Sequence, residues 1–269
     1  MKNPPPGSPL FPQPCGVVSY TYRREFQENV AATLDRIGAI GIRDVEFSSL
    51  FGLSAGGLRR LLDERAMTCS SFGVSYTDLQ ERTAAVALDA KALGARFVRV
   101  AWIPHESPFS PLQAQSLVET VNRVGKILRT QHDLTFCFHN HGFEFVPFGD
   151  ETLMDFIVQQ SDPDSVSFEL DILWAFFPGQ DPAALLRRYP TRFRLLHLKD
   201  LRKGAVGDLT GGTSQENDVA LGDGQIDIPD VLRAAHSAGV EHYYLEDESS
   251  SVDVQVPRSI AYLKSLRWT

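Results

Sequence analysis

The chain has 269 residues, and its 26 Lys and Arg against 34 Asp and Glu give a formal net charge of −8. Proteins that follow nucleic-acid backbones need clustered positive charge, and no run rich in Lys and Arg occurs here, so nucleic acid is not expected as a partner. The longest fully apolar run, 172–177, is far shorter than the roughly 20 residues that span a bilayer, so no membrane partner is expected either.

The chain begins with residues 1–14, which are rich in proline and lack the apolar stretch of a secretion signal. We expect an irregular tail there, since proline cannot continue a helix. Cys15, Cys69 and Cys137 are odd in number and form no CxxC pair, so neither a disulfide framework nor a structural zinc site is expected. Both features favour a cytoplasmic protein.

After the tail, eight segments rich in β-branched and aromatic residues are each followed by a segment with helical spacing of apolar residues. The predicted strands cover 16–20, 44–47, 68–74, 97–102, 135–140, 167–171, 194–198 and 242–246. The predicted helices cover 27–37, 57–64, 78–93, 112–129, 152–159, 183–189, 229–238 and 258–266.

A repeat of roughly 30 residues is the period of a (β/α)8 barrel. The competing open sheet usually carries a glycine-rich phosphate loop, and neither GxGxxG nor GxxxxGK[ST] occurs. The sequence therefore predicts an α/β fold, with a single (β/α)8 TIM barrel over 15–269 after the tail of 1–14.

Ionisable and other polar residues close the later strands, where the chemistry of such barrels is found. They are His139, Asn140, His141 and Glu144 in FHNHGFEF, Asp171 in ELD, His197 and Lys199 in HLKD, and Glu246 in LEDE. Glu144, Asp171 and His197 follow one another at about one strand–helix period, so we expect them at similar height. Carboxylates that converge with an imidazole favour one divalent ion such as Mn²⁺, Mg²⁺, Co²⁺ or Zn²⁺.

Five strings, HNHGFEF, ELDILW, LLHLKDL, LGDGQID and YYLEDES, resemble in order and spacing the xylose isomerase-like barrel superfamily. The resemblance is to its sugar phosphate isomerase/epimerase group, which includes proteins related to endonuclease IV. It covers most of 16–266 and implies a metal ion held by Glu144, Asp171, His197 and Glu246. Many relatives have a glutamate directly before the asparagine of the fifth strand, where this chain has His139. Either Glu144 reaches the metal, which we expect, or His139 replaces it.

Several of these residues also have a purely structural interpretation. His197 could be a hydrogen-bonded core histidine, and Glu246 could belong to a solvated run of charges with its neighbours. Lys199 either binds substrate or forms an ion pair with Asp200. Trp102 and Trp174 either pack in the core or stack on a sugar, whose C–H-rich face suits an aromatic ring.

A metal ion that chelates a hydroxyl and the adjacent carbonyl of a sugar acidifies the neighbouring C–H. We therefore predict a metal-dependent isomerase or epimerase of a keto sugar or related polyol, which works through an enediolate. Glu144 and Glu246 are the predicted acid/base pair, with His139 or His141 as alternative proton carriers. Lys199, Trp102, Trp174 and Asn140 are predicted to bind the substrate.

The main alternative is a lyase or dehydratase acting on a 3-keto-glycoside or an inosose-like compound, because expulsion of a β-substituent uses the same enolate chemistry. A phosphodiesterase like endonuclease IV and a non-catalytic sugar-binding barrel are more remote alternatives. The expected partner is a small sugar or polyol. Dimers and tetramers are common among the proteins that the chain resembles, so a homo-oligomer is a further expectation.

Overall fold

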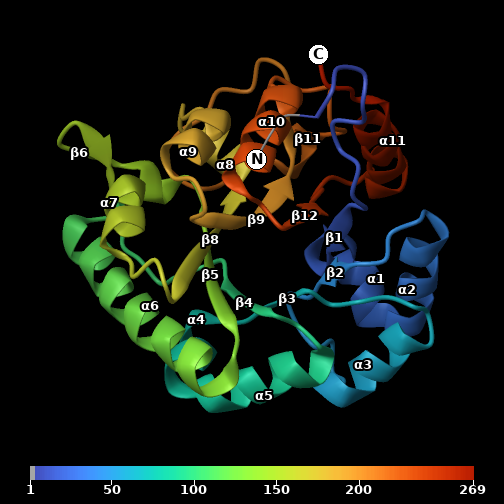
Figure 1. Cartoon of the computed structure of the whole chain (residues 1–269), viewed down its shortest axis with the longest axis horizontal. Coiled ribbons are helices and arrows are strands. Elements are labelled where there is room, and N and C mark those ends of the chain that lie inside the picture. Colours follow the sequence, from blue (N-terminus) through green and yellow to red (C-terminus); the bar gives the residue numbers. More distant parts are fainter. Residues whose placement is uncertain (1–3) are drawn as a thin grey trace.

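Eight parallel strands form a barrel in the computed structural model, which describes residues 4–269 (Figure 1). They are β1 (Gly16–Val18), β2 (Val45–Glu46), β3 (Ser71–Gly73), β4 (Phe97–Val100), β5 (Thr135–His139), β8 (Val166–Asp171), β9 (Phe193–Leu198) and β12 (His242–Leu245). Around the sheet the order is β2, β1, β12, β9, β8, β5, β4, β3. Parallel bridges from Asp44 to Thr68 and from Phe47 to Phe72 join the two end strands. The predicted TIM barrel is confirmed.

The helices form an outer ring around these strands (Figure 1). They are α1 (Arg23–Glu28), α2 (Val30–Ala39), α3 (Ala55–Asp63), α4 (Tyr76–Glu81), α5 (Thr83–Leu93), α6 (Pro111–His132), α7 (Leu153–Gln160), α8 (Ile172–Phe176), α9 (Pro182–Arg188), α10 (Ile228–Ala238) and α11 (Val252–Ser265). Local signals set many of their ends. Ser110 forms a capping box with Gln113 at the start of α6, and Gly239 ends α10 in the left-handed conformation, with a φ of 81°.

Three predicted helices differ from those observed. The segment 27–37 crosses the break at Asn29 between α1 and α2. The segment 78–93 forms two helices, α4 and α5, which are separated at Arg82. The segment 258–266 is the end of α11, which begins at Val252 and continues through Pro257. A proline inside a helical pattern usually marks a boundary because it removes one backbone donor, and for that reason the prediction began too late.

Short elements follow β5 and β9 at the carboxyl side of the barrel. After β5 come the one-turn helix η2 (Phe143–Phe145) and the hairpin of β6 (Pro147–Phe148) with β7 (Glu151–Thr152). After β9, β10 (Asp200–Leu201) pairs with β11 (Asp218–Val219), and η3 (Gln215–Asn217) lies between them. One further one-turn helix, η1 (Ser19–Tyr22), follows β1. Of these elements, η1, η3 and β11 contribute residues to the wall of the cavity at the barrel mouth.

The main apolar core lies between the strands and the helices, whereas the inside of the barrel holds buried charges. Glu46, Arg99, Glu169 and His197 are all buried there.

In the N-terminal tail, Leu10 and Phe11 are buried, and Pro9 forms a bridge with Arg267. Among the described residues, no helix is both long and apolar enough to cross a membrane.

Candidate metal centre

Neighbouring strands bring the predicted metal ligands to one end of the barrel. His139 is the last residue of β5, Asp171 is the last of β8, and His197 lies near the end of β9. Asp171 and His197 are direct partners in the register of β8 and β9. Glu246 follows β12 directly. The fold thus delivers carboxylates and imidazoles to the position where barrel enzymes carry their active sites.

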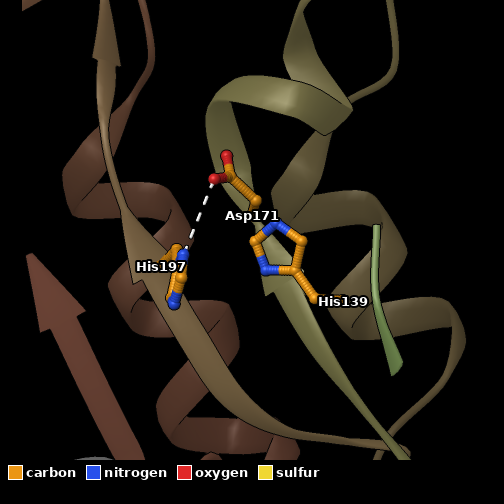
Figure 2. A group of neighbouring side chains, drawn as sticks. All are labelled: His139, Asp171 and His197. Carbon is orange, nitrogen blue, oxygen red and sulfur yellow. Dashed lines mark ion pairs between the residues drawn. The ribbon is translucent and has the colours of Figure 1, made fainter. Parts of the chain in front are cut away.

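His139, Asp171 and His197 form the upper donor group, in which one possible ligand atom of each residue lies within 4.8 Å of the others (Figure 2). All three are buried. Glu246 adjoins this group, because its Oε2 lies 2.8 Å from Nδ1 of His197. Two carboxylates and two imidazoles are a donor set that suits Mn²⁺, Zn²⁺ or a similar divalent ion.

Asp171 divides its carboxylate between two tasks. Oδ1 accepts a hydrogen bond from the backbone N–H of Trp174 at 2.9 Å and so caps α8. Oδ2 is buried without a hydrogen-bond partner among residues 4–269, and it lies 3.8 Å from Nδ1 of His197. Burial raises the pKa of Asp171 to about 7. A divalent ion bound here would favour the ionised carboxylate and use the free oxygen, so the residues present fit a metal ion.

His197 is held through both ring nitrogens. Nδ1 faces Glu246, while Nε2 lies 2.7 Å from Oε2 of Glu46 and 3.2 Å from Oε2 of Glu169. Burial by itself lowers the pKa of this imidazole, but Glu169, Glu246 and Glu46 together raise it well above its ordinary value. When Nε2 carries the proton, Glu46 accepts a hydrogen bond from it. The other ring nitrogen, Nδ1, is then the one that can bind a metal ion.

The two histidines of the HNH string are neutral. Burial lowers the pKa of His139 well below its ordinary value, and it lowers that of His141 to about 3. Their rings lie 5.0 Å apart between centroids, and both line the cavity at the barrel mouth. A neutral imidazole can accept a proton, so each has the protonation state that a general base needs.

Glu144 lies in η2, which follows the end of β5. Its Oε2 accepts a hydrogen bond from the backbone N–H of His141 at 2.9 Å, and its Oε1 has no hydrogen-bond partner within 4–269. Burial raises its pKa to about 8. Within the described part of the chain, the clusters of donor atoms less than 4.8 Å apart do not include Glu144. Its roles as metal ligand and as acid or base remain predictions.

The predicted substrate-binding residues fall into two sets. Trp102 and Trp174 line a cavity of about 1300 Å³ together with His139, His141, His197 and Glu246. Trp102 is 53% exposed, and its ring lies 5.2 Å from that of His141, so it can still cover a ligand. Trp174 is buried except for the face that meets this cavity.

Lys199 and Asn140, by contrast, are tied to neighbouring protein groups. Nζ of Lys199 lies 2.8 Å from Oε1 of Glu248 and 3.7 Å from carboxylate oxygens of Glu246 and Asp218. Within residues 4–269, Lys199 forms no ion pair with Asp200. Asn140 accepts from the N–H of Asp171 at 3.0 Å and donates to its carbonyl at 3.3 Å. Asn140 thereby fixes the end of β8, and Lys199 balances the acidic groups beside the centre.

The sequence did not predict Glu169 or Asp218 as residues of the site. Glu169 lies two residues before Asp171 on β8, and residues two apart on a strand share a face. The same alternation that placed Asp171 inside the barrel could therefore have found Glu169. Asp218 begins β11, a two-residue strand whose position depends on tertiary contacts rather than on a local pattern.

Comparisons with known proteins agree with the fold. A model of the xylose isomerase-like TIM barrel family matches residues 34–269. The inosose dehydratase of Geobacillus kaustophilus is 26% identical over 191 residues, which cover 63% of this chain and 61% of that protein. A sugar phosphate isomerase/epimerase from Parabacteroides distasonis has a similar structure, with a TM-score of 0.76 at 22% identity over 94% of each chain. The IolI protein, solved with a bound zinc atom, gives a TM-score of 0.73 at 14% identity over 94% of this chain and 95% of its own.

Proposed function

The chain belongs to the xylose isomerase-like TIM barrel family, and from that premise we propose that it is a divalent-metal-dependent dehydratase of a keto-inositol or a related keto polyol. The relatives named inosose dehydratase support the type of substrate and reaction. The zinc-containing IolI structure supports a divalent ion at the upper donor group. Asp171, His197 and Glu246 would hold this ion, together with His139 or Glu144.

The pair of neutral imidazoles on one side of the cavity is the observation that favours elimination. When bound, the metal ion polarises the ketone and makes the neighbouring C–H more acidic. His139 or His141 takes that proton. The electron pair left on carbon expels the hydroxyl group of the next carbon, which leaves as water after it receives a proton from the imidazolium. The loss of water therefore needs proton carriers on one face only.

Isomerisation or epimerisation is the second candidate, and the position of Glu246 favours it. Its carboxylate lines the cavity at the end of β12, whereas His139 and His141 line it at the end of β5. Interactions with Lys199 and His197 outweigh burial and lower the pKa of Glu246, so it is a carboxylate that can accept a proton. Proton carriers on both sides of a substrate are what inversion at a carbon requires.

Incubation of the Mn²⁺-loaded protein with an inosose in D₂O distinguishes the two reactions. We expect a product lighter by one water, which mass spectrometry detects, and new olefinic signals in the NMR spectrum. The variant His141→Gln is expected to react about 10²- to 10⁴-fold more slowly, as is usual after loss of a general base. If His139 is the base instead, His139→Gln shows this loss.

Other outcomes point elsewhere. Deuterium in the recovered ketone without loss of water would favour the epimerase. Neither exchange nor elimination with a panel of keto-inositols and keto sugars would contradict both enzymatic proposals.

A further inference from the structure

A second group of possible ligands lies directly beneath the candidate metal centre. Glu46, Glu169 and His197 each offer an atom within 4.8 Å of the others, and they form the lower donor group. Both carboxylates are fully buried, at 0% exposure. Buried carboxylates are costly unless a cation or several hydrogen bonds compensate them, so this group requires a positive charge.

Arg99 on β4 supplies that charge. One terminal nitrogen of its guanidinium lies 3.1 Å from Oε2 of Glu46, and Nε lies 3.3 Å from Oε2 of Glu169. The side chain is only 7% exposed. A guanidinium suits this position, since it stays charged when buried and its planar fork can meet two carboxylates at once.

The neighbouring strand leaves room for this guanidinium. A Cβ atom at Gly73, the last residue of β3, would lie 2.8 Å from the terminal nitrogen of Arg99 and 3.0 Å from its central carbon. A side chain at position 73 would therefore displace the guanidinium, so glycine at this position leaves room for the observed conformation of Arg99. The lower donor group is thus shaped around an organic cation.

We propose that Arg99 is a built-in cation that takes the place of a second metal ion between Glu46 and Glu169. The protein then binds a single divalent ion, in the upper donor group. Arg99 also acts as a positioning residue, because it keeps Glu46 in place as the acceptor for Nε2–H of His197. The inference rests on the proposed function only for the ion in the upper group.

The number of bound metal ions tests the inference without any assay of activity. Wild-type protein, Arg99→Ala and the charge-preserving control Arg99→Lys are dialysed to equilibrium against excess Mn²⁺, and bound manganese is measured by elemental analysis. We expect one equivalent for the wild type and for Arg99→Lys, and one equivalent more for Arg99→Ala. The extra ion should produce the EPR signature of two coupled Mn²⁺ ions.

The two proposals fail in different ways. An equal count in the wild type and Arg99→Ala, or two equivalents in the wild type, would overturn the role of Arg99. A wild type that binds no Mn²⁺ would contradict the metal in the proposed function, while one additional equivalent in Arg99→Ala would still support the role of Arg99.

If Arg99→Ala does not fold, the double variant Arg99→Ala/Glu169→Gln removes a carboxylate together with the cation. It is expected to fold, with a cooperative melting transition that the single variant lacks. Failure of the double variant to recover stability would also overturn the inference.

Discussion

Glu144 occupies an environment that disfavours a charged carboxylate. Burial raises its pKa to about 8 from an ordinary value of 4.5. Between these two pH values the folded protein holds a proton that the unfolded chain has released, so stability falls as the pH rises through this window. Glu144→Gln removes the titration and can still accept from the N–H of His141.

We therefore expect metal-free Glu144→Gln to resemble the wild type near pH 5 and to become more stable than it toward pH 8. The limiting difference is about 1.4 kcal/mol per pH unit. Urea unfolding at a series of pH values in the presence of a chelator measures this. The exposed carboxylate of Glu81 provides the control, since Glu81→Gln should leave the profile of the wild type unchanged. Parallel profiles for Glu144→Gln and the wild type would show that Glu144 is ionised in the folded state.

The sequence predicts the position of a side chain well where the residue lies at the end of a strand. One period of separation predicted that Asp171 and His197 lie at similar height, and the two are partners in the register of β8 and β9. The position of Glu144 could not be predicted, because it depends on the turn of η2 after the strand has ended. The position of Arg99 could not be predicted either, because its partners Glu46 and Glu169 come from distant parts of the chain.

At the level of secondary-structure elements, α6 contains a position, Gly125, where only glycine leaves room for the neighbouring backbone. A Cβ atom at Gly125 would lie 2.6 Å from the backbone oxygen of Ser165. Alanine is a better helix former than glycine by roughly 1 kcal/mol, yet the close approach of these backbones should outweigh that preference. We expect Gly125→Ala to lower the free energy of unfolding by about 1–3 kcal/mol.

The matched control is Gly56→Ala in α3, where nothing lies within 4 Å of the added Cβ. This change should leave stability equal or raise it by up to about 1 kcal/mol. Chemical denaturation of both variants measures the difference. A stabilising effect of Gly125→Ala would mean that α6 can move away from Ser165 without cost.

The sequence predicted the long elements better than the short ones. Strongly periodic segments such as 112–129 correspond to observed helices, here α6 (Pro111–His132). The two-residue strands β10 and β11 have no periodicity to detect, and they are held by tertiary contacts. Asp200, the first residue of β10, binds the chain that follows β11. Its carboxylate accepts hydrogen bonds from the backbone N–H groups of Leu201, Gly222, Gly224 and Ile226.

Across the whole molecule, the candidate centre links metal binding to stability. A ligand at a hundred times its Kd stabilises a folded protein by about 2.7 kcal/mol. For a chain of this size, that gain corresponds to an increase of roughly 5 °C in Tm. We expect Mn²⁺ or Zn²⁺ to raise the Tm of the chelator-treated protein by this amount in differential scanning fluorimetry.

Asp171→Asn is the matched control for this experiment, because its amide oxygen can still cap α8 while the charge on the ligand is lost. The variant is expected to fold and to show little response to metal. Equal shifts in the wild type and in Asp171→Asn would place the bound ion elsewhere.

The charges inside the barrel also have a consequence for how the chain assembles. Glu46 and Arg99 come from β2 and β4 in the first half of the sequence, whereas Glu169 and His197 come from β8 and β9 in the second half. A half-barrel made from the second set alone would contain Glu169 without its guanidinium, and one made from the first alone would lack the imidazole that Glu46 holds. Closing the barrel buries each of these groups together with its partners from the other half, which favours cooperative docking of the two halves.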